Sequence, residues 1–160
     1  MKKSVEISAY SIIISIISLA VMAAVTYFSF VRGAAGLAWI LIAMIILICM
    51  FSLFYMPLSV DVDGKYLYVN RPLKVKTIHL DEISDVKLCP PTMGARRISG
   101  SGGWFGYWGR YYEGDLGEYF EYYGKASDCF LVTLKDGRKY MLGCKDAPEM
   151  VEAIKKIIKS

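Results

Sequence analysis

Few residues in this sequence have the type and spacing needed to bind a metal ion or to form a covalent intermediate. The cysteines are Cys49, Cys89, Cys129 and Cys144, and the single histidine is His79. Zinc sites use closely spaced ligands such as a Cys-x-x-Cys pair, and no such pair occurs here. His79 ends an apolar strand pattern, and no sequence pattern pairs it with a candidate nucleophile. The sequence therefore predicts no metal, no cofactor and no enzymatic activity.

Two further patterns resemble known sites but lack their defining residues. The glycines of Gly100–Gly103 are typical of a phosphate loop, yet no Lys-Ser or Lys-Thr follows them. The acidic neighbours Asp81, Glu82 and Asp85 lie near a strand boundary, where such residues more often form a turn than an acid and base pair. Residues 61–160 carry 16 Lys or Arg against 14 Asp or Glu, a net charge of +2 (16 − 14). No strong basic field exists for nucleic acid, so we expect no nucleic-acid partner.

The segment from Gly94 to Gly124 has an unusual composition, with nine of the 14 glycines and ten of the 22 aromatic residues of the chain. Glycine permits close backbone approach, and Trp and Tyr combine large apolar faces with polar groups. One interpretation is an excursion whose aromatic side chains fold back over a sheet. The other is an interaction surface for a partner protein or for lipid, and its candidate residues are Arg96, Arg97, Trp104, Phe105, Trp108 and Arg110.

Two apolar runs at the N-terminus predict a transmembrane hairpin. Ile7 to Val31 is 25 residues long and Gly33 to Val60 is 28, and Arg32 is the single charged residue between Ile7 and Val60. A helix needs about 20 apolar residues to cross the hydrocarbon of a bilayer, so each run is long enough. The short connection around Arg32 predicts two antiparallel helices in contact. We therefore divide the chain into a hairpin, residues 1–60, and a domain, residues 61–160.

The distribution of positive charge predicts the orientation of the hairpin. Lys2 and Lys3 precede the first run, and Lys65, Arg71, Lys74 and Lys76 follow the second, whereas Arg32 stands alone between them. Positive charge is retained on the cytoplasmic side of a membrane. We expect a multi-pass protein of the inner (cytoplasmic) membrane with both termini and the domain in the cytosol.

Serines recur along one face of the first run, at Ser8, Ser11, Ser15 and Ser18. Small residues at steps of three and four let two helix backbones approach closely in lipid. Alternatively, each hydroxyl donates to the carbonyl four residues back and does nothing more. The sequence leaves both interpretations open.

The domain begins with a series of alternating segments that predict strands. Leu58 to Asp63 and Tyr66 to Asn70 flank Gly64-Lys65, where an Asp-Gly sequence predicts a type I′ hairpin turn with positive φ. Leu73 to Leu80 and Ile83 to Leu88 predict two further strands.

The C-terminal third predicts a second hairpin and a helix. Cys129 to Leu134 and Lys139 to Gly143 flank Asp136-Gly137. A two-residue turn there places Cys129 opposite Cys144, as free thiols in a reducing cytosol. The segment from Asp146 to Glu149 is typical of a helix start, and Met150, Val151, Ile154, Ile157 and Ile158 form one apolar stripe.

This arrangement resembles a bacterial pleckstrin-homology (PH) domain over residues 58–158. The resemblance is carried by the Gly100–Gly109 run GSGGWFGYWG, by Leu116-Gly117 with the aromatic segment after it, by VTLKDGRKY at Val132–Tyr140, and by the Pro-Glu helix start. It implies an α+β fold: a two-helix transmembrane hairpin followed by a PH-like β-sandwich or barrel capped by a C-terminal helix. Tyr123-Gly124-Lys125 departs from the Tyr-Ala-Thr common in such sequences, so that turn is expected to differ.

The sequence as a whole favours a non-enzymatic, membrane-anchored binding or scaffolding module. The expected partners are the lipid bilayer and another membrane or cytosolic protein, while the oligomeric state stays open. The alternative is a lipid-sensing module in which the segment rich in glycine and aromatic residues meets the membrane surface. Recognition of phosphoinositides, known from some PH domains, is not expected at the first turn, because that turn offers only Gly64-Lys65.

Overall fold

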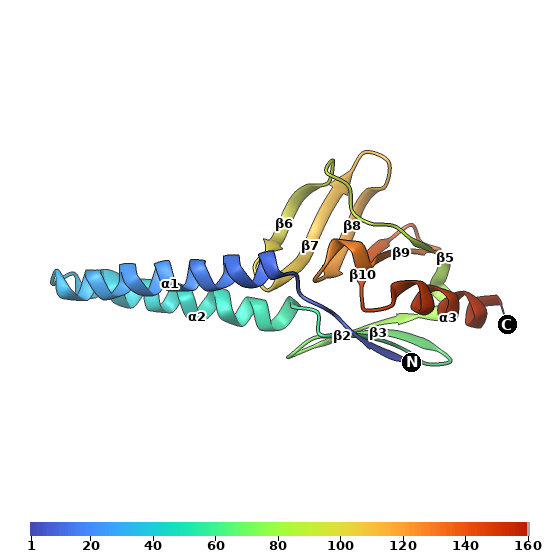
Figure 1. The fold of residues 1–160 in the computed structure, drawn as a ribbon, viewed down its shortest axis with the longest axis horizontal. Coiled ribbons are helices and arrows are strands. Elements are labelled where there is room, and N and C mark those ends of the chain that lie inside the picture. Colours follow the sequence, from blue (N-terminus) through green and yellow to red (C-terminus); the bar gives the residue numbers. More distant parts are fainter. Residues whose placement is uncertain (160) are drawn as a thin grey trace.

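A computed structural model describes residues 1–159 of the chain. Two long helices extend side by side from one end of a β-rich domain, and both described termini lie at the domain end (Figure 1). The domain contains a four-stranded sheet, a six-stranded sheet and a C-terminal helix. The predicted α+β layout is therefore confirmed.

The hairpin consists of α1 (Ala9–Val31) and α2 (Ala35–Tyr55). Both helices are long and apolar enough to cross a membrane. Ser8 caps α1, since its hydroxyl accepts a hydrogen bond from the Ser11 amide, and Gly33 adopts a φ of +77° in the connection. A left-handed conformation of this kind ends a helix and costs least at glycine. The connection therefore reverses the chain within three residues.

The four-stranded sheet contains a strand that precedes the hairpin in sequence. Its order is β1 (Lys2–Ser4), β2 (Ser59–Val62), β3 (Tyr66–Asn70) and β4 (Val75–His79), all antiparallel. No pattern in the sequence predicted β1. Because β1 and β2 flank the hairpin, their pairing brings the chain before α1 and the chain after α2 together at the base of the helices.

The six-stranded sheet has the order β5 (Ile83–Leu88), β9 (Cys129–Leu134), β10 (Lys139–Gly143), β8 (Gly117–Tyr123), β7 (Gly106–Glu113) and β6 (Arg96–Gly103). Its strands are antiparallel except for β8 and β10, which run parallel. Short 3-10 helices at Leu80–Glu82 and Ala126–Asp128 connect strands. The sheet leaves β6 as an edge strand beside the helices.

The main core lies between the two sheets and under α3 (Ala147–Lys159). Its buried side chains come from both sheets and from the apolar stripe of α3, whose Met150 and Ile154 are fully buried. The helix was predicted from that stripe. Burial of aliphatic side chains in this layer supplies the main hydrophobic stabilisation of the domain.

The turn between β2 and β3 forms at the predicted residues but with a different conformation. Gly64 is not among the residues with positive φ, so the turn is not of type I′. Instead, the carboxylate of Asp63 accepts hydrogen bonds from the amides of Lys65 (2.8 Å) and Tyr66 (2.7 Å). An aspartate that bonds to its own backbone in this way stabilises a turn without positive φ.

The register predicted for the last hairpin is wrong by one residue. Cys129 pairs with Gly143, and not with Cys144, because the connection holds three residues with Gly137 at a φ of +88°. This is the geometry of a type I turn followed by a left-handed residue. The one-residue shift places Cys129 and Cys144 in different clusters on opposite faces of the sheet, and all four cysteines are free.

Candidate functional site

The segment rich in glycine and aromatic residues forms β6, β7 and β8, and two glycines allow β6 and β7 to cross closely. Gly100 and Gly109 are cross-strand partners with φ values of +122° and +130°. A Cβ added at either position would come within 2.2 Å of a carbonyl oxygen of the opposite strand. Only glycine fits both places, so the ribbon formed by these strands depends on them.

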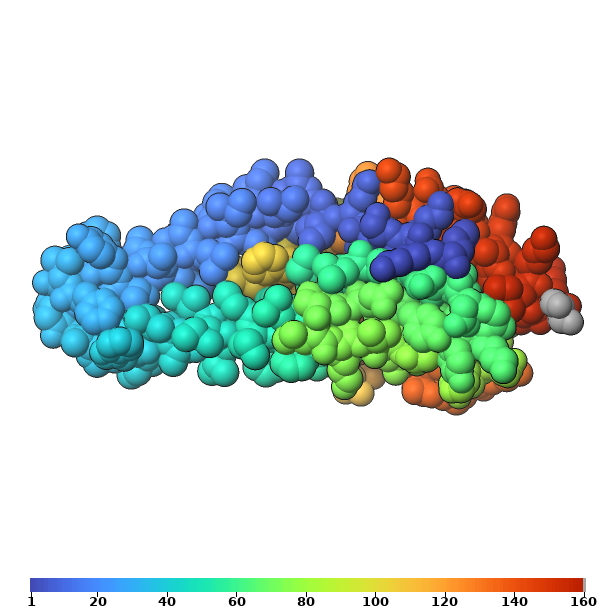
Figure 2. All heavy atoms as spheres, turned by 90° about the horizontal axis from the view of Figure 1, so that it is seen from below, coloured from blue at the N-terminus to red at the C-terminus, as the bar shows by residue number. Residues whose placement is uncertain are grey.

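The turn between β6 and β7 contacts both helices. Trp104 Nε1 donates a hydrogen bond to Ser52 Oγ of α2 (2.8 Å), and the Phe105 amide donates to Ser15 Oγ of α1 (2.9 Å). Figure 2 shows atoms of this region, in yellow, between the blue α1 and the teal α2. The tip of the ribbon therefore bridges the hairpin at its domain end.

The backbone of this tip is strained at a residue that contacts the helices. Phe105 has a φ of +50°, which is unfavourable for a bulky side chain. The hydroxyl of Ser101 donates to the carbonyl of Trp104 (2.9 Å), so the turn is held from its own side as well. A strained residue persists where surrounding contacts over-determine it, and here those contacts come from α1 and from the ribbon itself.

The serine face of α1 has a role that neither interpretation from the sequence contained. Ser15 Oγ does donate to the carbonyl of Ser11, four residues back (2.7 Å), and Ser52 Oγ does the same toward Ile48 (2.9 Å). Their remaining acceptor capacity is used by the Phe105 amide and the Trp104 indole. These buried hydroxyls therefore attach the domain to the helices.

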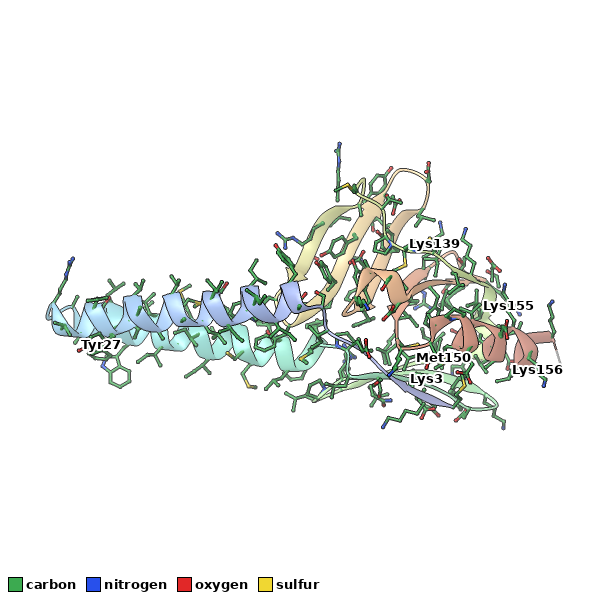
Figure 3. All side chains as sticks on the ribbon, viewed as in Figure 1. Lys3, Tyr27, Lys139, Met150, Lys155 and Lys156 are labelled. Carbon is green, nitrogen blue, oxygen red and sulfur yellow. The ribbon has the colours of Figure 1, made fainter. Side chains whose placement is uncertain are left out.

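Further contacts fix the domain at the base of the hairpin. The ring of Trp108 stacks on Tyr55 at the end of α2, with ring centroids 5.1 Å apart. The Ser8 amide donates to the carbonyl of Gly124 (2.9 Å). Lys3 on β1 forms ion pairs with Asp146 and Glu149 at the start of α3, where Figure 3 places its side chain. The helices and the domain are thus joined through strands, side chains and backbone.

The structure separates the six candidate interaction residues into two groups. Trp104, Phe105 and Trp108 are half-buried against the helices or the neighbouring strands. Arg96, Arg97 and Arg110 are exposed on β6 and β7, and none of them forms an ion pair with a residue in 1–159.

A cleft of about 380 Å³ lies between the helices and the β6 edge. Ile14, Ile48 and Phe51 form its apolar wall, while Arg97 and the backbone of Gly100–Gly102 line the opposite side. Arg97 is the one candidate arginine that faces this cleft.

A second group of basic residues is not among the site residues predicted from the sequence. Arg71 lies on the loop between β3 and β4, with its side chain buried, and Lys74 and Lys76 follow it. These three residues line a pocket of about 490 Å³ between the end of α2 and both sheets. A basic cluster directly after a long apolar helix is consistent with contact to anionic lipid, whereas from the sequence these residues predicted only the orientation of the hairpin.

A separate cluster on the other face of the six-stranded sheet contains two buried carboxyl groups. Glu121 is fully buried, and neither of its carboxyl oxygens has a hydrogen-bond partner among residues 1–159. Burial raises the pKa of Glu121 to about 8, and the charge of nearby Glu113 contributes to the increase. Glu113, close by, accepts hydrogen bonds from Thr92 and from Tyr119. The cluster favours a protonated Glu121 at neutral pH.

The cysteines lie in surroundings that suppress thiolate formation. Burial raises the pKa of the Cys144 thiol to about 12 and raises that of Cys129 still further above its usual range. Within the part of the chain that the structure describes, no group of three or more His, Cys, Asp or Glu side chains is arranged to hold a metal ion.

Comparison with known proteins identifies the family from the domain alone. No curated protein and no solved structure matches the chain significantly. The family model for the bacterial PH domain matches residues 58–158, which covers β2 to α3 and includes the ribbon that contacts the helices. The chain therefore belongs to the bacterial PH domain family.

Proposed function

We propose that the chain is a non-enzymatic, membrane-anchored PH-like module of the bacterial inner membrane that binds or scaffolds another membrane or cytosolic protein. In this proposal residues 1–60 form the transmembrane hairpin, residues 61–160 form a cytosolic domain, and β1 is the part of the N-terminus that joins that domain. The observation that carries the proposal is the pair of hydrogen bonds from Trp104 and Phe105 to Ser52 and Ser15. They give the domain a fixed position against the helices, which a flexible tether would not provide.

The dimensions of the helices support the membrane placement. Helices of 23 and 21 residues extend about 34 and 31 Å, close to the thickness of about 30 Å for bilayer hydrocarbon. Tyr27 and Trp39 are exposed near the far end, where Figure 3 places Tyr27, and Tyr10 is exposed near the domain end. Aromatic side chains at both ends of a hairpin suit the two interfaces of a membrane.

The distribution of charge supports the orientation. Lys2, Lys3 and the basic residues from Lys65 to Lys76 belong to the domain end, whereas Arg32 lies at the far end. Retention of positive charge in the cytosol then places the domain and both termini inside the cell.

The partner surface in this proposal is the outer edge of β6 with its arginines. β6 pairs with β7 on one side only, so its other edge carries unpaired backbone groups. Ile98 on this strand is 51% exposed and stands beside Arg96 and Arg97. An edge strand flanked by cations suits an extended, acidic segment of a partner that adds to the sheet.

The alternative function is lipid sensing through the segment rich in glycine and aromatic residues. It is favoured by the position of Trp104 and Phe105, which lie between two apolar helices. In this alternative the tip responds to the lipid around the hairpin, and no protein partner is needed.

Site-specific photo-crosslinking in intact cells tests the protein-binding proposal. A photoreactive phenylalanine replaces Ile98 on β6 or, as a matched control, Ile158 on α3, which is also exposed. We expect a discrete protein adduct from position 98 that Arg97→Glu abolishes, and none from position 158. Equal adducts from both positions, or lipid as the single species attached at position 98, would contradict a partner at the β6 edge.

A further inference from the structure

We propose that the pocket lined by Arg71, Lys74 and Lys76 binds the phosphate headgroup of an anionic phospholipid from the leaflet next to the domain. The inference rests on the membrane placement proposed above and adds a ligand class and a site to it. The candidate lipid-facing residues of the sequence analysis lie elsewhere, on the β6–β7 ribbon.

The first argument is that Arg71 is a buried cation without an anion. Arg71 is 8% exposed, and no carboxylate among residues 1–159 forms an ion pair with it. Its Nε donates to the carbonyl of Lys74 (3.2 Å), and its Nη1 donates to the hydroxyl of Tyr122 (3.3 Å). A guanidinium has five N–H donors, so three are left for an acceptor from outside the protein.

Two aromatic rings contact the guanidinium. It lies 5.8 Å from the ring centroid of Tyr55 and 5.2 Å from that of Tyr122. Such contacts orient a cation without neutralising it, since the rings carry no net charge. A bound phosphate would supply the missing negative charge and accept the free donors in a bidentate manner.

The charge of the pocket matches a phosphate. Arg71, Lys74 and Lys76 contribute three positive charges, and no Asp or Glu of the described residues 1–159 lines the pocket. Lys76 lies over the ring of Tyr140, 5.2 Å from its centroid, so its ammonium group is also held toward this face. The volume of about 490 Å³ accommodates a headgroup with part of its glycerol backbone.

The walls of the pocket indicate that the phosphate belongs to a lipid. Phe51, Phe54 and Tyr55 come from the last turns of α2, and Phe51 and Phe54 are 58% and 41% exposed. In the proposed placement these rings lie at the cytosolic edge of the hydrocarbon, beside the cations. The amide of Leu73 donates to the carbonyl of Leu53, which fixes the basic loop against this end of α2 (3.3 Å). A phosphate in the pocket would thus have acyl chains alongside the exposed face of α2.

The experiment uses the full chain in lipid nanodiscs that contain phosphatidylcholine and a trace of photoreactive lipid. The photoreactive lipid is either phosphatidylglycerol, which is anionic, or phosphatidylcholine. The readout is the yield of lipid attached to peptides that contain residues 51–55 or 71–76. We expect strong labelling of these peptides by phosphatidylglycerol and weak labelling by phosphatidylcholine.

A pair of double variants separates the pocket from general attraction to an anionic surface. Lys74→Gln with Lys76→Gln should reduce labelling by phosphatidylglycerol about 25-fold, since each lysine near a membrane contributes about fivefold to affinity. Lys155→Gln with Lys156→Gln removes the same charge from α3, where Figure 3 shows both lysines at the far end of the domain, and should leave labelling unchanged. Circular dichroism of both variants confirms that they fold.

Three results would overturn the proposal. Equal labelling by the two lipids would exclude recognition of the negative charge, and an equal loss in both double variants would exclude the pocket. Labelling that free glycerol phosphate abolishes would favour a soluble phosphate ligand over a lipid. Failure of the membrane placement itself would be distinct, because the chain would then be released from cell membranes by alkaline carbonate.

Discussion

Arg71 and Glu121 are both buried ionisable residues, and their surroundings differ in kind. Arg71 lies at the wall of an open pocket and contacts two aromatic rings, with a hydroxyl and a carbonyl as acceptors and three donors left free. Glu121 is enclosed on the opposite face of the six-stranded sheet, with no hydrogen-bond partner among the described residues. A guanidinium does not lose its proton in a protein, whereas a carboxyl group becomes neutral when burial is unfavourable.

The surroundings of Arg71 suit a binding site, whereas the burial of Glu121 lowers the stability of the fold when its carboxyl group is charged. The charge of Arg71 persists and remains available to an anion in the pocket. Glu121 remains protonated and therefore neutral, but its carboxyl group becomes charged as the pH rises above its raised pKa. We therefore expect changes at Glu121 to alter folding and changes around Arg71 to alter binding.

The largest expected effect is that of Glu121→Gln on the pH dependence of stability. The pKa of Glu121 is raised to about 8 in the folded chain from an ordinary value near 4.5. Between these values the folded state binds more protons than the unfolded state, so wild-type stability falls as pH rises through this window and levels off above it. Gln carries no proton to lose, so the variant should be more stable than wild type by roughly 3 to 5 kcal/mol above the window and similar below it.

Denaturation of the full chain in detergent micelles, at a series of pH values, measures this difference. Glu118→Gln is a matched control on the same strand, because Glu118 is exposed. A wild-type stability that does not fall between mildly acidic and mildly alkaline pH would show that Glu121 is ionised or solvated in the folded chain.

A smaller effect is expected from Tyr122→Phe, which sharpens the description of the Arg71 site. The substitution keeps the ring beneath the guanidinium and removes the hydroxyl that accepts from Nη1. Loss of one hydrogen bond to a charged group should destabilise the chain by about 1 to 2 kcal/mol in detergent. Addition of phosphatidylglycerol should recover part of this loss, since the freed donor then has a phosphate to bind. Tyr112→Phe, at an exposed residue of β7, should have no effect in either condition.

The smallest expected effect concerns the two buried thiols on opposite faces of the sheet. The pKa of Cys129 is raised by burial and also by Glu121, whereas burial is the main cause at Cys144 and Glu121 is not among its causes. Glu121→Gln should therefore lower the pKa of Cys129 and speed its alkylation at alkaline pH by less than about tenfold, without affecting Cys144. Mass spectrometry of alkylated peptides measures both rates, and a parallel change at Cys144 would point to general opening of the domain.

The predictable parts of the fold are those specified by neighbouring residues. The hairpin helices follow from two apolar runs, and α3 follows from the apolar stripe that contains Met150 and Ile154. The turn at Asp136-Gly137 was located correctly, but its register was not, because Gly137 has a positive φ and Asp136 does not, so the connection is a three-residue loop and not a two-residue type I′ turn. Local sequence marks where a turn occurs and leaves the number of its residues open.

The candidate site was less predictable because its contacts join distant residues. The indole of Trp104 bonds to a serine 52 residues earlier, and the Phe105 amide bonds to one 90 residues earlier. The strand β1 is three residues long and forms only because β2 lies beside it. The alternation along β8 indicates which residues share a face of the sheet with Glu121. It does not indicate whether other side chains cover that face, and the burial of Glu121 depends on this covering.

The central claim is that the domain is held rigidly on the hairpin by the β6–β7 tip, and a distance measurement tests it most directly. Spin labels at Arg32→Cys, in the far connection of the hairpin, and at Lys155→Cys, on α3, span the helices and the domain. Cys49 and Cys89 are replaced by alanine, and the buried Cys129 and Cys144 stay unlabelled because their thiol pKa values are raised. For the full chain in nanodiscs we predict a single narrow distance distribution that broadens when Ser15→Ala, Ser52→Ala and Trp104→Ala are combined. A distribution that is already broad in the parent chain, or that the triple variant leaves narrow, would contradict the claim.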